Sequence, residues 1–151
     1  MKSIIEDKTI LHLFTEIAIV EHLLRNRYDR VTPAGMTTAQ FGVLTHFIRN
    51  AKSEERLATL AWAFQDSEDY MAEKVASLVA RGMLSSQPVV GDTRDMIVSI
   101  TDLGRRAHAD ALDEIGPEIL QLLEGIDEDE LKTSLRVVQE IRRALDNLPD
   151  R

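Results

Sequence analysis

The sequence predicts a mostly helical α+β domain with one small β-hairpin. Apolar residues recur at helical spacing through most of the chain. Residues 84–90 and 96–101 are instead rich in β-branched side chains and flank the turn-prone segment Gly91-Asp92-Thr93-Arg94-Asp95. The length of 151 residues suits one domain, at about 100–200 residues per domain. We therefore expect residues 1–151 to form a single domain.

The first helix is predicted over about residues 3–29 by an amphipathic stripe: Ile10, Leu13, Phe14, Ile17, Val20 and Leu24. The segment Thr32-Pro33-Ala34-Gly35 ends it. Thr37 and Gln40 then have the spacing of a capping box, which opens a helix with Phe41, Leu44, Phe47 and Ile48 on one face.

A short helix over about residues 54–64 is predicted next. Ser67 is a plausible N-cap for the helix that follows, and Gly82 ends that helix. Its inward stripe is Met71, Val75, Leu78 and Val79. In the hairpin, Pro88 restricts the first strand to an edge. Two more helices follow, one over about 103–124 with a candidate bend at Gly116-Pro117, and one that begins at about 127–130.

The net charge of −8 argues against a polybasic surface for membranes or nucleic acid, although a local basic patch remains compatible with it. The acidity is concentrated in residues 102–151, with 13 acidic and 7 basic residues, whereas residues 37–101 carry 8 and 6. The chain has no cysteine, which excludes disulfides, thiol nucleophiles and cysteine-ligated metals. The N-terminus has no signal-peptide core, and the longest charge-free run, residues 31–48, is too polar to span a bilayer. We expect a soluble, cytoplasmic protein.

Two short helices joined by a tight turn and followed by a hairpin describe a winged helix-turn-helix. In that arrangement the second helix enters the major groove of DNA and the hairpin tip reaches phosphates or the minor groove. The sequence also resembles the MarR-type transcriptional regulators, through Gly35-Met36-Thr37-Thr38-Ala39-Gln40-Phe41, Val43-Leu44, Leu60-Ala61, Ser67, Leu78, Gly82-Met83-Leu84, Asp92-Thr93-Arg94 and Ser99-Ile100-Thr101-Asp102-Leu103-Gly104-Arg105.

The resemblance implies a homodimer that binds pseudo-palindromic double-stranded DNA. Residues 1–34 and 103–151 would be dimerisation helices, and residues 35–102 the winged helix-turn-helix. The long aliphatic stripes of the terminal helices support dimerisation independently, because one winged segment offers too little surface to cover them. The expected function is a transcriptional regulator of the repressor type, released by a small aromatic or anionic ligand.

The candidate DNA-binding residues lie on the outward face of the helix after Ser67 and at the hairpin tip: Ser67, Asp69, Tyr70, Glu73, Lys74, Ser77, Thr93 and Arg94. In the family, the aspartate of the Asp-x-Arg motif holds the arginine in or beside the minor groove. For Arg94, a solvated turn with a surface ion pair is the alternative.

The recognition helix is unusually acidic. Glu68 and Asp69 suit the helix dipole at a first turn. Glu73 lies mid-face, where it would either accept a hydrogen bond from cytosine N4 or mark a helix that no longer enters DNA. The alternative function is therefore an interaction protein of the same fold that has lost DNA binding and meets a protein partner through this acidic helix.

The resemblance also implies an effector cleft between the dimer helices and the winged segment, and four residues are candidates to line it: His12, Arg25, Tyr28 and His46. His12 and His46 are placed to approach each other where the first two helices meet, with ordinary interface histidines as the alternative. No histidine pair has metal-ligand spacing, and no catalytic arrangement of residues stands out. We expect no metal, no cofactor and no enzymatic activity.

Overall fold

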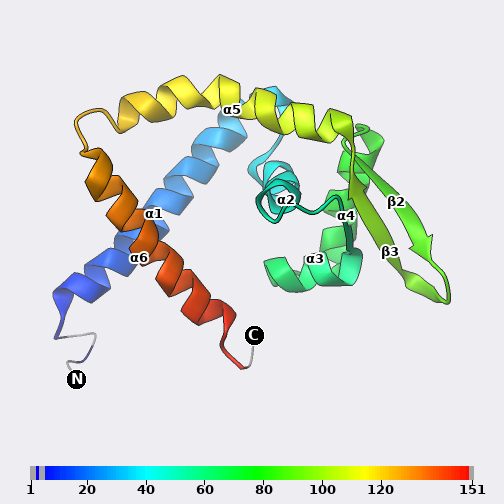
Figure 1. The fold of residues 1–151 in the computed structure, drawn as a ribbon, viewed down its shortest axis with the longest axis horizontal. Coiled ribbons are helices and arrows are strands. Elements are labelled where there is room, and N and C mark those ends of the chain that lie inside the picture. Colours follow the sequence, from blue (N-terminus) through cyan, green and yellow to red (C-terminus); the bar gives the residue numbers. More distant parts are fainter. Residues whose placement is uncertain (1–2, 4–5, 150–151) are drawn as a thin grey trace.

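The computed structural model describes residues 3 and 6–149 of the chain. Its elements, in order, are α1 (Lys8–Val31), the 3-10 helix η1 (Pro33–Gly35), α2 (Thr38–Arg49), β1 (Glu54–Arg56), α3 (Leu57–Phe64), α4 (Glu68–Ala80), β2 (Leu84–Val89), β3 (Asp92–Ile100), α5 (Asp102–Leu122) and α6 (Glu128–Asp146). Figure 1 shows the winged part, α2 to β3, at one end of α5, and α1 and α6 toward the other. The mostly helical α+β fold with a small hairpin wing is confirmed.

The predicted helix boundaries follow side-chain caps. Thr37 and Gln40 form the reciprocal hydrogen bonds of a capping box, and the Ser67 hydroxyl accepts from the Tyr70 N–H. The prediction for the first helix starts too early, because Asp7 caps α1 by accepting from the N–H groups of Thr9 and Ile10. Residues 4–5 of that predicted range lie outside the described residues. No described helix is long and apolar enough to cross a membrane.

The sheet corrects one prediction. Residues 54–56, predicted as the start of a helix, form strand β1, which pairs antiparallel with β3 in the register Glu54↔Ser99 and Arg56↔Ile97. The strand order is β1-β3-β2, so β2 is an edge strand, as Pro88 requires. Helix propensity in residues 54–56 is overridden because β3 supplies backbone partners from far along the chain.

The core lies between α2, α3, α4, the sheet and the start of α5. Its fully buried large side chains are Met36, Leu44, Phe47, Leu60, Met71, Leu78 and Leu84. At the α4–α5 corner the Thr101 hydroxyl donates to the Gly82 carbonyl (2.6 Å) and accepts from the Gly104 N–H (3.0 Å). A Cβ on Gly104 would overlap the Met83 carbonyl oxygen, so the corner needs glycine there.

The remaining helices leave their apolar faces uncovered. Neither α1 nor α6 contains a buried residue. Exposed apolar side chains follow α1, α5 and α6: Ile10, Leu11, Leu13, Phe14, Ile19, Val20, Leu23, Leu112, Leu120, Leu122, Leu135, Val138 and Leu145. Exposed apolar surface of this extent is typical of a protein–protein interface. Helix α5 continues through Gly116 and Pro117 as one element.

Asp95 on β3 fastens the wing to α3. Its carboxylate is 2.7 Å from Nε of Arg56 and accepts from the N–H groups of Ala58, in the first turn of α3, and Met96. Burial raises the pKa of Asp95, but the N–H groups of Met96 and Ala58 and the Arg56 guanidinium outweigh it, and the net pKa is lowered. The aspartate therefore stabilises the fold in its ionised form, and this contribution is lost only as the pH falls below the usual aspartate range.

We predict that Asp95→Ala lowers the free energy of unfolding by about 1–3 kcal/mol, because a helix cap and a charged hydrogen bond are lost together. Chemical denaturation at fixed protein concentration measures the effect. Asp92→Ala is the control, since Asp92 is an exposed wing aspartate whose carboxylate accepts from the Arg94 N–H. Equal stabilities for the two variants would contradict the anchoring role.

His108 is a buried histidine that packs α5 against α2. Its ring stacks on Phe41 with centroids 4.7 Å apart, and its Nε2 lies 3.1 Å from the Thr45 hydroxyl. The Thr45 hydroxyl donates its hydrogen to the Phe41 carbonyl. The lone pairs of the hydroxyl oxygen are therefore left to accept a hydrogen bond from the Nε2–H group of His108. Burial lowers the pKa of His108, so the fold favours its neutral form.

The lowered pKa predicts acid sensitivity. As the pH falls below about 6.5, the unfolded chain binds a proton that folded His108 resists, and the free energy of unfolding decreases. His108→Phe keeps the stacked ring and should remove this part of the pH dependence. Denaturation curves between about pH 8 and pH 5, a range that spans the ordinary histidine pKa, measure the effect. His22→Gln, at an exposed histidine of α1, should retain it. The same pH dependence in His108→Phe and the wild type would contradict the assignment.

Candidate nucleic-acid interface

Helix α4 presents one face to solvent. Met71, Val75 and Leu78 are buried against the body, whereas Glu73 and the half-exposed Tyr70 point outward. Ser67, Glu68 and Asp69, at the start of the helix, are also exposed. Figure 1 places α4 beside the β2–β3 hairpin, away from α1 and α6. The predicted outward face is therefore accessible at Asp69, Tyr70 and Glu73.

The structure turns Lys74 and Ser77 inward. The Lys74 ammonium lies 2.7 Å from an Asp66 carboxylate oxygen, with only 14% of the lysine side chain exposed, and 4.4 Å from the centre of the Tyr70 ring. The Ser77 hydroxyl donates to the Lys74 carbonyl and accepts from the Gln40 amide. These two predicted DNA-binding residues hold α4 in place, and their polar groups are engaged within the protein.

Arg81 fixes the C-terminal end of α4. Its Nη1 donates to the Gly35 carbonyl (2.9 Å) and its Nη2 to the Ala34 carbonyl (3.2 Å). Gly35 has φ +72°, and a Cβ there would lie 3.1 Å from Arg81 Nη2, so glycine permits the contact. Glu114 of α5 accepts from the Ala34 N–H at 3.0 Å. The η1 segment thereby joins α4 to α5, a role that periodicity along α4 could not reveal.

The wing tip carries Thr93 and Arg94, both exposed. The Asp92 carboxylate accepts from the backbone N–H of Arg94 at 2.9 Å, so it shapes the turn through the main chain. No ion pair or hydrogen bond of the Arg94 guanidinium is found among residues 6–149. Arg94 lines a groove with Glu68, Asp69 and Ala72 of α4, which brings the wing cation next to the acidic first turn.

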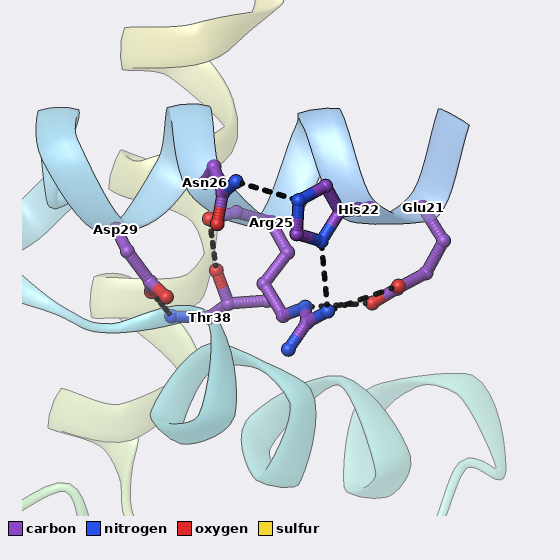
Figure 2. A network of polar contacts seen from close by, with 6 residues as sticks. All are labelled: Glu21, His22, Arg25, Asn26, Asp29 and Thr38. Atoms are coloured by element: carbon purple, nitrogen blue, oxygen red, sulfur yellow. Dashed lines mark hydrogen bonds and ion pairs between the residues drawn. The ribbon is translucent and has the colours of Figure 1, made fainter. Parts of the chain in front are cut away.

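Arg25, a predicted effector residue, belongs to a polar network on α1. Figure 2 shows its guanidinium between Glu21 and His22, with Nε 3.0 Å from a Glu21 carboxylate oxygen. The same network ties α1 to the start of α2, because Thr38 donates its N–H to Asp29 (2.7 Å) and its hydroxyl to the Arg25 carbonyl (3.2 Å). Arg25 thus has an acidic partner and also positions α2.

The other predicted effector residues do not share one site with Arg25. Tyr28 lines a small apolar cavity with Pro33, Met36, Thr37, Thr38, Phe41 and Ile115, and none of the other three candidates lines it. Burial, and then Glu118, raise the pKa of Tyr28. His46 packs against Phe64 with its Nε2 buried, 3.6 Å from a Glu55 carboxylate oxygen. His12 is exposed on α1, and among residues 6–149 no hydrogen bond, ion pair or ring contact joins it to His46.

The chain is similar to known proteins in its three-dimensional structure and not detectably in its sequence. No family model and no curated protein matches the chain. Solved structures match over nearly its full length. One is MarR, with a TM-score of 0.75 at 20% identity, covering 90% of this chain and 95% of that one.

Two further structures are regulators described as belonging to the MarR family. Sco5413 from Streptomyces coelicolor matches with a TM-score of 0.71 at 20% identity, over 91% of this chain and 96% of its own. A regulator from Rhodococcus sp. RHA1 matches with a TM-score of 0.71 at 18% identity, over 93% and 96%. At these identities the likeness concerns the fold. The chain has the winged helix-turn-helix fold of the MarR-family transcriptional regulators, as the sequence motifs predicted.

Proposed function

We propose that the protein is a cytoplasmic, dimeric DNA-binding transcriptional regulator. The observation that carries this proposal is the exposed face of α4 next to a wing whose tip holds Arg94, free of ion pairs among residues 6–149. In a winged helix-turn-helix these are the two elements that meet the major groove and the adjacent backbone or minor groove. The likeness of the fold to DNA-binding regulators supports the same assignment.

The homodimer is proposed from the uncovered apolar faces of α1, α5 and α6. Leu120 is 73% exposed and Leu135 58%, and such side chains line helices that the winged segment does not cover. A second copy of the chain buries them in a two-fold arrangement, which presents two copies of α4 to a pseudo-palindromic site. In this proposal residues 1–34 and 103–151 form the dimer and residues 35–102 bind DNA.

Charge pairing within the protein limits the number of phosphate contacts. Among the six basic residues of segment 35–102, four have partners in the protein: Lys52 with Glu55, Arg56 with Asp95, Lys74 with Asp66, and Arg81 with η1. Arg49 and Arg94 have no such partner among residues 6–149. A dimer that uses both would have a slope of log affinity against log salt of about −3.6.

We further propose that the protein is a repressor, and that a small aromatic or anionic molecule releases it from DNA. Its support is the cavity that Tyr28 and Phe41 line between α1, α2 and α5, close to η1 and hence to Arg81. A regulator of similar fold, TM-score 0.67 at 15% identity, is described as organohalide-sensing and was solved with 2,4-dichlorophenol bound. A molecule that enters the cavity would displace η1 and alter the position of α4.

A second candidate function is favoured by the exposed carboxylates Glu68, Asp69 and Glu73. In that interpretation the protein keeps the fold but binds a basic protein through the acidic face of α4. Retention of a basic partner by the wild type, together with no salt-dependent binding to any genomic DNA fragment, would favour it.

We predict that Arg94→Ala weakens DNA binding by roughly 1–3 kcal/mol and reduces the magnitude of the salt slope by about 2, because the dimer carries two copies of Arg94. Anisotropy titrations with promoter DNA adjoining its own gene, between about 50 and 200 mM salt, measure both quantities. Arg136→Ala is the control, because it also removes one arginine charge but lies on α6, outside the proposed DNA-binding segment. An unchanged slope in Arg94→Ala would refute the wing contact.

We predict that Leu135→Asp converts the dimer to monomer, because a carboxylate in a buried apolar interface is costly to desolvate. Thr133→Asp adds the same charge about 160° around α6, on its polar side, and should leave the dimer intact. Sedimentation velocity at several protein concentrations distinguishes the two. Dimer retained in Leu135→Asp would show that the α6 stripe lies outside the interface.

A further inference from the structure

The exposed face of α4 carries no available cation. Lys74 is paired with Asp66 at 2.7 Å and largely buried, and Arg81 is bonded to the carbonyls of Ala34 and Gly35. These are the only basic residues in segment 67–81, all of which the structure describes. The usual reader of guanine, an arginine or lysine that donates to O6 and N7, is therefore missing from this helix.

Beyond the acidic first turn with Glu68 and Asp69, the exposed face carries one aromatic side chain, one carboxylate and small apolar side chains. Glu73 lies at the centre of the exposed face, with Tyr70 on one side and Ala76 and Ala80 on the C-terminal side. Lys74 pairs with Asp66 and not with Glu73, and no other cation forms an ion pair with Glu73 among residues 6–149. The Glu73 carboxylate is therefore exposed to solvent, and no hydrogen bond or ion pair among residues 6–149 uses its oxygens.

A free carboxylate discriminates strongly among base edges. Guanine presents only acceptors in the major groove, O6 and N7, which repel it. Adenine offers the N6 donor beside its own N7 acceptor, whereas cytosine offers its N4 amino group and has no major-groove acceptor of its own. Against the negative potential of DNA, the carboxylate is tolerated only where it gains this hydrogen bond.

We propose that Glu73 is a specificity-determining residue that selects cytosine at one position of each half-site, by accepting a hydrogen bond from its N4 amino group. This proposal rests on the proposed DNA-binding function. Arg49 and Arg94 supply the attraction to the DNA backbone. The Glu73 carboxylate is repelled by the negative charge of the DNA unless cytosine lies opposite it, and binding therefore requires that base. The small Ala76 and Ala80 leave room for the helix to approach the groove at that position.

The test is selection from a pool of randomised DNA duplexes, run in parallel with the wild type, Glu73→Gln and Glu68→Gln. Both variants lose one negative charge from an exposed position of α4. Glu68 lies about 140° around the helix from Glu73, so it controls for the general gain in affinity that follows from lower negative charge. Because glutamine pairs with adenine N6 and N7, Glu73→Gln should exchange the selected cytosine for adenine, at two symmetry-related positions.

Titration of defined duplexes then gives the magnitude. Replacing the selected C·G pair by T·A should weaken the wild type and Glu68→Gln by about 5- to 10-fold, and should leave Glu73→Gln nearly unaffected. Identical motifs for the wild type and Glu73→Gln, or a wild-type motif without the paired cytosines, would overturn the proposal while leaving DNA binding intact. Enrichment of no sequence by the wild type, and no retention of the starting pool, would instead refute the DNA-binding function itself.

Discussion

The arrangement of the winged segment depends on the hydrogen bonds between Arg81 and the η1 segment. Arg81 ends α4, and its guanidinium donates to the carbonyls of Ala34 and Gly35, while Glu114 of α5 accepts from the Ala34 N–H. A single short segment is therefore bonded to α4 and to α5. Pro33 of this segment also lines, with Tyr28, the small cavity in which we propose that an effector binds.

These bonds also determine what α4 offers to a partner. A helix with Lys74 and Arg81 turned outward would be an ordinary basic reader of DNA. Because both cations are bonded within the protein, the exposed face is left with Asp69, Tyr70, Glu73 and small side chains. In the proposed complex with DNA, attraction to the backbone then comes from the wing and Arg49, and α4 contributes selectivity more than affinity.

Much of the fold could be predicted because its boundaries are set by local chemistry. The capping box of Thr37 and Gln40, the Ser67 cap and the edge position of Pro88 are each encoded within a few residues, and each is confirmed. Strand β1 could not be predicted, because Glu54 and Arg56 become a strand only through pairing with Ser99 and Ile97.

The sequence predicted which residues of the candidate site are exposed, but not which of its charged side chains are paired within the protein. Helical periodicity correctly placed Tyr70 and Glu73 on the exposed face, since exposure follows from position around the helix. The partners of Lys74 and Arg81 lie 8 and 46–47 positions away, and no pattern in the sequence joins them. The proposed effector residues also diverge, because Arg25 pairs with Glu21 within α1 whereas His46 lies near Glu55 of β1.

The central claim is that two copies of α4 meet one face of a duplex together. Hydroxyl-radical footprinting on a duplex enriched by the wild-type protein tests it most directly. We expect two protected segments on each strand, centred about 10 base pairs apart, as for two recognition helices in successive major grooves. A single protected segment, or two whose separation places them on opposite faces of the duplex, would contradict it.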